Sequence, residues 1–395
     1  MGPSNTDSDV IGTVPAEVLR FRGEFPILEH KVYLANNSKG PVSHAVLQAH
    51  AEYLDGWRTQ GTPWECWAKK HEQLRAAFAR MIGAQMHEIA LLPSTTTGLG
   101  TLAAGIDWRS DRPAVAFDDY NFPSVTYLWH AQAAYGAEIR RVHPDEHGEL
   151  PPEAFDQVLD ERCKLLSVAH VCYKNGHRVD LPAIGRRAHD VGAWVFVDDY
   201  QSCGSRAVNV RDAGIDVLST GTYKFMLGSA GVAFLYVAEE LLDQLHPRLT
   251  GWYGQEDRTD FQINRHVEAS GATRFQIGTP AYPSIYDSLA GIELLSAVGF
   301  DQIRDWIEVL TARLTARLED EGFVLASPRD PGKRGPQVAI RAHDMDRAVA
   351  DLMERDIIAS CRGGNLRIAF HYFNTFGDID VLMDGLHACG TLERA

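Results

Sequence analysis

The sequence has few cysteines, no basic excess and no long apolar run. No stretch approaches the roughly 18 consecutive apolar residues of a membrane span, and the N-terminus has neither the basic region nor the apolar run of a secretion signal. We therefore expect a cytoplasmic protein with no membrane partner. Lys and Arg number 38 against 53 Asp and Glu, a net charge of −15. This balance argues against a nucleic acid partner, because such a partner requires clustered basic residues.

The cysteine pattern excludes two further classes of protein. The six cysteines are Cys66, Cys163, Cys172, Cys203, Cys361 and Cys389. They are widely spaced and include no Cys-x-x-Cys pair, so neither a zinc site nor a disulfide framework is indicated. We expect no bound metal, and most of these side chains should be small buried hydrophobes.

Short apolar runs alternate with helical patterns through the middle of the chain. The runs that we predict to be strands are Ala114–Asp118, 164–170, Trp194–Asp198, 217–220 and 232–237. Alternation of this kind implies a largely parallel sheet covered by helices on both faces. In such sheets, ligands bind beyond the carboxyl ends of the strands.

A chain of 395 residues should divide into more than one domain. Amphipathic patterns predict helices at 43–58 and 64–82. The alternation of strand and helix patterns becomes irregular after about residue 250, and a long helix is expected at 284–320. The mixed segments that follow, with a final helix from Asp378, read as a small α+β unit. We therefore expect an N-terminal segment (1–45), a large domain (46–283) and a small C-terminal domain (284–395).

Two strand ends carry the residues of greatest chemical interest. VFVDDYQS is an apolar strand that ends in Asp198, with Gln201 three residues later, and STGTYKFMLGSAG places Lys224 in a turn between two strands. Such a lysine can form a Schiff base with an aldehyde, and an acidic group at a neighbouring strand end can keep a pyridine nitrogen protonated. Either residue alone is more often a solvated lysine or a strand-end cap, but their combination favours this chemistry.

With these motifs, the sequence resembles the class V group of pyridoxal-phosphate enzymes over nearly its whole length. That group includes cysteine desulfurases, selenocysteine lyases, kynureninases and isopenicillin-N-epimerase-like proteins. The resemblance implies an α/β, fold type I architecture, in which a mainly parallel seven-stranded sheet lies between helices and a small α+β domain follows. It also implies pyridoxal 5′-phosphate as cofactor. Lys224 resembles the Schiff-base lysine that also moves the Cα proton, Asp198 the partner of the pyridine nitrogen, and Gln201 the ligand of the phenolic oxygen.

The stretch LLPSTTTGLG should open a helix, whose first amides and hydroxyls can bind an anion. Taken alone, this stretch is more often a Thr-rich N-cap. The resemblance makes Thr95 and Thr96 phosphate contacts, and it adds Thr222, Tyr223 and Trp252 as further phosphate ligands.

Other positions are assigned by the same resemblance. Thr279, in RFQIGTP, resembles the residue that reaches the phosphate from the neighbouring subunit of a homodimer. Phe122, in NFPS, matches the residue that stacks on the pyridine ring, although a core Phe before a proline turn is the alternative. His170, in HVCYKNG, is retained and is assigned a catalytic role. Asp199 and Tyr200 stand where relatives carry small residues, so we expect a narrower pocket.

The resemblance also indicates residues that bind an amino-acid substrate. Arg367, in NLRIAFHYF, should pair with the α-carboxylate, because a guanidinium can bind a carboxylate through two parallel hydrogen bonds. Asn37 and Ser38, in YLANNSKGP, should lie near the substrate entrance. Tyr173 and Asn175 depart from the common family pattern and could set specificity, or they could form a turn closed by a capping Asn.

Departures from the relatives narrow the expected reaction. Kynureninases carry an Asn where this chain has Gly278-Thr279-Pro280, which argues against a kynurenine substrate. Cysteine desulfurases need a nucleophilic Cys on a loop before the carboxylate arginine, but residues 337–352 contain none, and Cys361 lies only six residues before Arg367. A persulfide mechanism is therefore unsupported.

Our leading hypothesis is a lyase of secondary metabolism that cleaves a C–S bond at Cβ of a cysteine S-conjugate. The alternatives are an isopenicillin-N-epimerase-like epimerase, a decarboxylation-coupled oxidative deaminase and an aminotransferase. A protein that only binds the cofactor would require an idle Lys224, which makes it the weakest hypothesis.

Overall fold

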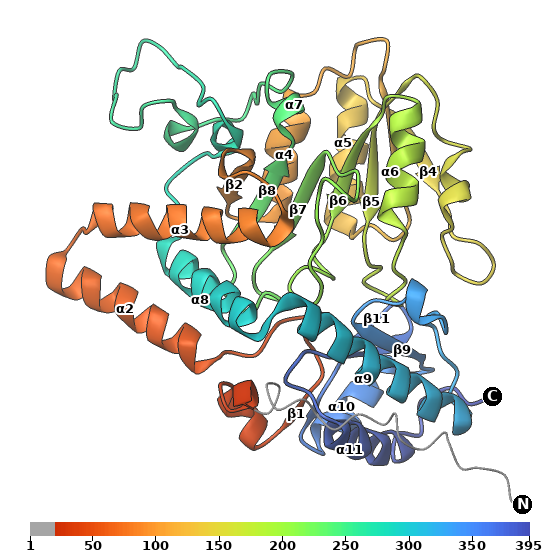
Figure 1. The fold of residues 1–395 in the computed structure, drawn as a ribbon. Helices are drawn as coiled ribbons and strands as arrows, with labels where there is room; N and C mark the ends of the chain where they lie inside the picture. Colours follow the sequence, from red (N-terminus) through yellow and green to blue (C-terminus); the bar gives the residue numbers. More distant parts are fainter. Residues whose placement is uncertain (1–19) are drawn as a thin grey trace, which may run out of the picture.

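A seven-stranded sheet forms the centre of the large domain in the computed structural model, which describes residues 20–395. The strand order is β2-β8-β7-β6-β5-β3-β4 (Figure 1). The strands are β2 (Ile89–Leu92), β3 (Ala114–Asp118), β4 (Glu138–Val142), β5 (Cys163–Ala169), β6 (Trp194–Asp198), β7 (Val217–Gly221) and β8 (Ala233–Val237). The predicted seven-stranded α/β sheet is confirmed. The strands that we predicted did not include β2 and β4. The edge strand β4 is half-exposed and carries two arginines, whereas β2 is buried but only four residues long.

Strand direction gathers several loops at one edge of the sheet. Strands β3 to β7 are parallel, β8 is antiparallel to β7, and β2 is antiparallel to β8. The carboxyl ends of β2, β3, β5, β6 and β7 therefore meet at the same edge, where β8 begins. Ligands of open α/β sheets bind at this edge.

Helices cover both faces of the sheet, as the alternation predicted. In β3, Val115 and Phe117 pack in the core that includes α4 and α5, whereas Ala116 packs in the core that includes α3 and α6. The helices of the large domain are α2 (His44–Gln60), α3 (Trp64–Ile82), α4 (Thr95–Gly105), α5 (Pro123–Gln132), α6 (Leu181–Asp190) and α7 (Glu239–Leu242). Figure 1 shows α2 and α3 projecting together from the body, beside α8.

The single long helix expected at 284–320 is wrong. The structure has α8 (Tyr282–Val298) and α9 (Phe300–Asp320), separated by Gly299 at φ 97°, a conformation that an α-helix cannot contain. Most buried residues of α8 belong to the core of the large domain, and Leu310 and Leu314 of α9 belong to that of the small domain. Ile303 and Ile307 in the first half of α9 also belong to the core of the large domain, so the two cores meet within α9.

The small domain is built on a three-stranded antiparallel sheet of order β11-β12-β9. Its elements are β9 (Gln337–Arg341), α10 (Met345–Met353), β10 (Ile357–Ile358), β11 (Ser360–Arg362), β12 (Asn365–Ala369) and α11 (Phe376–His387). β1 (Val32–Tyr33) pairs with β10, so the described part of the N-terminal segment joins this domain. Residues 1–19 of that segment lie outside the described residues.

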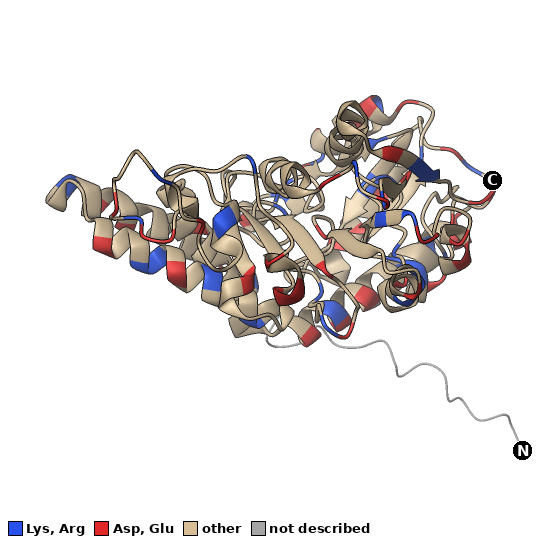
Figure 2. Ribbon diagram, turned by 90° about the horizontal axis from the view of Figure 1, so that it is seen from above, with Lys and Arg blue, Asp and Glu red and all other residues tan. Residues whose placement is uncertain are grey.

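Figure 2 shows acidic and basic residues interspersed along the elements in this view. Within residues 20–395, none of the helices combines the length and the apolar character needed to cross a bilayer.

Candidate active site

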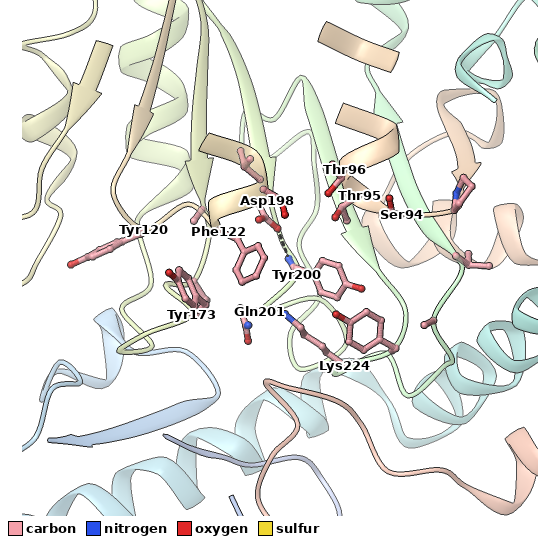
Figure 3. A pocket seen from close by; sticks show the side chains of 18 of the residues that line it. Ser94, Thr95, Thr96, Tyr120, Phe122, Tyr173, Asp198, Tyr200, Gln201 and Lys224 are labelled. Atoms are coloured by element: carbon pink, nitrogen blue, oxygen red, sulfur yellow. Dashed lines mark hydrogen bonds between the residues drawn. The ribbon is translucent and has the colours of Figure 1, made fainter. Parts of the chain in front are cut away.

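A pocket of about 270 Å³ lies at the carboxyl edge of the sheet (Figure 3). Its lining includes Ser94, Thr95, Thr96, Phe122, Tyr173, Asp198, Tyr200, Gln201, Tyr223 and Lys224. The sequence thus predicted most of these side chains, and the topology explains why they meet, because each follows or ends a strand at this edge.

Lys224 lies in the turn that follows β7. Its Nζ is 4.3 Å from the centroid of the Tyr200 ring and 5.8 Å from that of Phe122, so the amine stands beside two aromatic rings. Burial lowers the pKa of Lys224 to about 8, opposed by the charge of Asp198. A depressed lysine pKa increases the fraction of free amine, which is the form that attacks an aldehyde.

Asp198 ends β6 and points into the same pocket. Its carboxylate accepts a hydrogen bond from the Tyr200 amide at 3.1 Å (Figure 3, dashed line). Burial raises the pKa of Asp198 to about 6, while the Tyr200 amide and the charge of Lys224 oppose the rise. A buried carboxylate whose charge is incompletely compensated is well suited to pair with a protonated ring nitrogen.

Phe122 is held in place by an aspartate that the sequence reasoning missed. Asp118 ends β3, and its Oδ1 accepts hydrogen bonds from the amides of Tyr120 at 2.8 Å and Asn121 at 3.0 Å. This turn leads into α5 and leaves the Phe122 ring in a T-shaped contact with Tyr173 at 5.1 Å. The sequence signal that could have indicated Asp118 is its position at the end of an apolar strand, which it shares with Asp198.

The first turn of α4 forms the hydroxyl-rich end of the pocket. Ser94 caps the helix by accepting a hydrogen bond from the Thr97 amide at 3.1 Å, and Thr95 and Thr96 line the pocket beside it. Unpaired amides at a helix N-terminus attract anions. This end of the pocket is therefore suited to a phosphate group, and Tyr223 lies within reach of the same cavity.

Three of the expected phosphate ligands lie outside the pocket of this chain. The Thr222 hydroxyl donates to the Ser229 carbonyl at 2.7 Å. Trp252 stacks on Phe261 in an exposed loop, at a centroid distance of 6.3 Å. Thr279 lines a separate small cavity, which shares Gly231 with the pocket.

Arg367 is buried beside the pocket. Its Nη1 donates to the Tyr173 carbonyl at 2.6 Å, and its Nε is buried without a hydrogen-bond partner among the described residues. Burial lowers the pKa of Arg367 to about 10. A buried guanidinium with unused donors is suited to bind an anion.

The other residues that we predicted to bind the substrate lie in the N-terminal segment and in a turn near the pocket. The Asn37 carbonyl accepts a hydrogen bond from Gln201 Nε2 at 3.1 Å, and Ser38 next to it is exposed. Gln201 Oε1 is buried without a partner among the described residues. Asn175 does not line the pocket. Its Oδ1 accepts from the His177 amide at 3.0 Å, as a turn-capping Asn does.

His170 lies away from the pocket. Its Nδ1 is 2.6 Å from Asp199 Oδ1, and both side chains are buried. Asp199 follows Asp198 directly, and successive side chains after an extended strand point to opposite faces. His170 lines a second cavity of about 740 Å³ instead. The catalytic role that the motif assigned to it therefore lacks a contact with the pocket.

Gly221 is a further residue that the motifs did not indicate. A Cβ atom at this position would overlap the Tyr200 ring, so the glycine makes room for that tyrosine beside Lys224. The unusual Tyr200 was the available signal, because a large residue in a position usually held by small ones needs space from a neighbour.

Replacing Gly221 with Ala should weaken cofactor binding by at least about 10-fold, because the added methyl group pushes the Tyr200 ring into the pocket. Titration of the apoprotein with pyridoxal phosphate, followed by absorbance, measures the effect. Tyr200→Ala should restore binding in the Gly221→Ala background, whereas Tyr200→Phe should not, because its ring still overlaps the methyl group. Equal affinities in all these variants would contradict the argument.

The pocket fits pyridoxal phosphate group by group. It presents an amine for the aldehyde, a buried carboxylate for the pyridine nitrogen, aromatic rings for the ring plane and a helix N-terminus for the phosphate. Among the described residues, no cluster of three or more His, Cys, Asp or Glu is arranged to bind a metal ion.

Comparison with known proteins agrees with this fit. The family described as aminotransferase class-V matches residues 32–382. An uncharacterized aminotransferase of Bacillus subtilis (strain 168), YcbU, is 33% identical over 93% of this chain and 97% of its own length. A kynureninase of Shouchella clausii (strain KSM-K16) is 29% identical over 91% of this chain and 88% of its own. The solved structure of a cysteine desulfurase from Thermococcus onnurineus NA1 has a TM-score of 0.85 at 23% identity, covering 95% of this chain and 98% of that chain.

The family match spans both domains. The sheet topology places the pocket of this chain at the carboxyl edge of the large sheet. The cofactor is pyridoxal 5′-phosphate. This chain belongs to the class V aminotransferase family and is a pyridoxal-phosphate-dependent enzyme of fold type I.

Proposed function

We propose that this enzyme cleaves the C–S bond at Cβ of cysteine S-conjugates without forming a persulfide on a cysteine. Lys224 holds the cofactor and moves the Cα proton, and Arg367 binds the substrate carboxylate. The observation that carries the proposal is the position of Cys361, the cysteine nearest to Arg367 in the sequence.

Cys361 stands on the wrong face of its strand for sulfur transfer. It lies opposite Leu366, a residue of the small-domain core, whereas Arg367 lies opposite Ser360. Neighbouring residues of a strand alternate between faces, so Cys361 points away from the arginine. Its Sγ donates to Asp346 at 3.2 Å, and burial and Asp346 raise the pKa of the thiol. A thiol with a raised pKa is a poor nucleophile.

The elimination that we propose uses Lys224 and Arg367 together with the cofactor. The bound cofactor supplies an electron sink for the pair left at Cα. Lys224 Nζ takes the Cα proton, and the Cβ–S bond breaks with its electron pair departing on the thiolate. Arg367 fixes the α-carboxylate, so that the C–H bond faces the lysine. The unsaturated amino acid that remains hydrolyses to pyruvate and ammonium.

Incubating the purified holoenzyme with a panel of S-substituted cysteines should release pyruvate and thiol in equal amounts. Cys361→Ser should keep the rate within about twofold, because the thiol takes no part in the reaction. A rate loss of 100-fold or more in this variant would support a persulfide route instead. If no conjugate yields pyruvate, the lyase proposal is wrong. Solvent deuterium at Cα of an intact substrate would then indicate an epimerase, and oxygen uptake with CO₂ release an oxidative deaminase.

Transamination is the second candidate, and the name of the Bacillus subtilis relative favours it. It requires the same lysine to move a proton from Cα to the cofactor. Conversion of the cofactor to its pyridoxamine form by an amino acid, without release of thiol, would select this reaction.

We also propose a homodimer in which Thr279 reaches the phosphate of the partner subunit. Thr279 is exposed here, and Phe261 and Ile263 in the loop nearby are 77% and 102% exposed. Exposed apolar side chains of this size mark a surface that another protein covers. Light scattering should give twice the chain mass of 43.8 kDa, and a monomer would overturn this proposal.

A further inference from the structure

The sheet of the small domain carries three arginines on one face. Across the strands β11, β12 and β9, Ser360 lies opposite Arg367, and Arg362 lies opposite Asn365, which lies opposite Arg341. Directly opposed residues of a sheet point to the same side, and so do residues two apart in one strand. Arg341, Arg362 and Arg367 therefore share a face, and the three strands contain no Asp or Glu.

This face is turned toward the pocket. Arg367 Nη1 donates to the Tyr173 carbonyl at 2.6 Å, and Asn365 Nδ2 donates to the Lys174 carbonyl at 3.4 Å. On the other side, Ser360 Oγ donates to Asn37 Oδ1 at 2.9 Å. The arginine-bearing face thus lies against two parts of the entrance, the turn at residues 173–175 and the N-terminal segment at Asn37.

The charge of Arg362 is not neutralised by the described residues. Its guanidinium is exposed and has no hydrogen bond or ion pair there. After burial, the charge of Arg362 is the largest influence that lowers the pKa of Arg367, and it also lowers that of Lys224. Asp346 does not offset this charge directly, because it contacts Cys361 on the opposite face of β11. Lys174 is a further positive group, which has no ion pair among the described residues and whose Nζ lies 5.5 Å from the centroid of the Tyr173 ring. Its Cδ would lie 3.4 Å from a Cβ at Gly363.

The α-carboxylate of an amino acid pairs with Arg367 and leaves Arg362 without an anion. Arg362 repels Arg367 and Lys224, and a second anion that enters with the substrate would offset this repulsion. We propose that Arg362, assisted by Lys174, binds a carboxylate at the far end of the substrate side chain. The substrate would then be an amino acid with two carboxylates. Its sulfur leaving group rests on the proposed function, whereas its second carboxylate does not.

The strand geometry sets the distance between the backbones of the two arginines that would bind that substrate. Arg362 stands diagonally from Arg367 across the β11–β12 pair, so their backbones are about 7–8 Å apart. Both side chains are flexible, and S-carboxymethyl-L-cysteine is a conjugate of comparable span. S-carbamoylmethyl-L-cysteine is its neutral isostere, since an amide replaces the distal carboxylate.

The experiment compares these two compounds by titrating the holoenzyme and following the cofactor absorbance. The acid should bind at least about 10-fold more tightly than the amide, as expected for a charge-assisted hydrogen bond. Arg362→Gln should reduce the preference to within about twofold by weakening the acid alone, and Lys174→Gln should reduce it partially. Arg186→Gln, at an exposed arginine of α6, is the matched control and should leave both affinities unchanged.

A second pair of ligands separates this inference from the lyase proposal. L-2-aminoadipate and its side-chain amide, L-homoglutamine, have no leaving group at Cβ, so their binding does not depend on elimination. If conjugates are not cleaved but the acid of this pair is still preferred through Arg362, the lyase proposal falls and the inference stands. The inference is overturned if wild-type enzyme binds acid and amide equally in both pairs. Loss of the two affinities to the same extent in Arg362→Gln would also overturn it, because it would indicate a structural role.

Discussion

Replacing Lys224 with Ala should abolish the visible absorbance of the bound cofactor and reduce turnover by more than about 10³-fold. Among the described residues, Lys224 is the only lysine that lines the pocket. In our proposal it is both the attachment point of the cofactor and the base that takes the Cα proton. Absorbance of the purified protein and pyruvate release from the best conjugate measure the two effects. Turnover that persists in the variant would refute the role of Lys224 in both lyase and transaminase chemistry.

The matched control for this experiment is Lys69→Ala, at an exposed position of α3 outside the pocket. It should leave absorbance and turnover within about twofold of wild type. If Lys224→Ala loses turnover but binds added pyridoxal phosphate with wild-type affinity, the remaining contacts at Asp198 and α4 provide most of the binding free energy.

Replacing Asp198 with Asn should have opposite effects on activity and on the stability of the apoprotein. Turnover should fall by about 10²–10⁴-fold, because an amide cannot keep the pyridine nitrogen protonated. The apoprotein should become more stable at pH 8 by up to about 3 kcal/mol. This figure is the rise of the Asp198 pKa from 3.8 to about 6, converted at about 1.36 kcal/mol for each pH unit.

The sign of this effect follows from the direction of the pKa shift. Because the folded-state pKa of Asp198 is raised, its contribution to stability is fully present below pH 3.8 and is lost as the pH rises through about 6. The difference in unfolding free energy between Asp198→Asn and wild type should therefore grow between about pH 4 and pH 6 and then level off. Denaturant unfolding of the two apoproteins across this range measures it.

Asp190→Asn, at an exposed carboxylate of α6, should change neither turnover nor stability and serves as the control. An Asp198→Asn apoprotein that is less stable than wild type at pH 8 would contradict the argument. It would mean that Lys224 compensates the buried carboxylate fully before the cofactor binds.

The strands of the large sheet were predictable because most are buried on both faces. Such strands are continuous apolar runs in the sequence, and the runs at 114–118 and 194–198 matched β3 and β6 to the residue. The edge strand β4 was missed because a strand with an exposed face has no such run, and the buried strand β2 was missed because its apolar run is only four residues long. The break between α8 and α9 was missed because one glycine can lie inside a helix or end it, and its φ angle decides which.

Local motifs and the family resemblance predicted much of the candidate site, because most of its residues end a strand or follow one. Asp198, Lys224, Thr95 and Phe122 lie where the sequence placed them, around one pocket. His170 carried an equally clear motif, yet its side chain faces another cavity. A motif gives the position of a residue along the chain. The side of the sheet to which its side chain points depends on the conformation of the backbone after the strand.

By itself, the sequence determined the fold class through its apolar periodicity, because periodicity is a local property. Its resemblance to the class V enzymes implied the cofactor and singled out Lys224 and Asp198 as candidate site residues. Tertiary structure alone decided that Cys361 lies opposite a core residue, that His170 lines a cavity other than the pocket, and which arginines share a face with Arg367. These outcomes depend on strand register and on the backbone that follows each strand, and the contact of Arg367 with Tyr173 joins residues more than a hundred positions apart. Such contacts leave no periodic signal in the chain, and they set the charge that a substrate meets at the entrance.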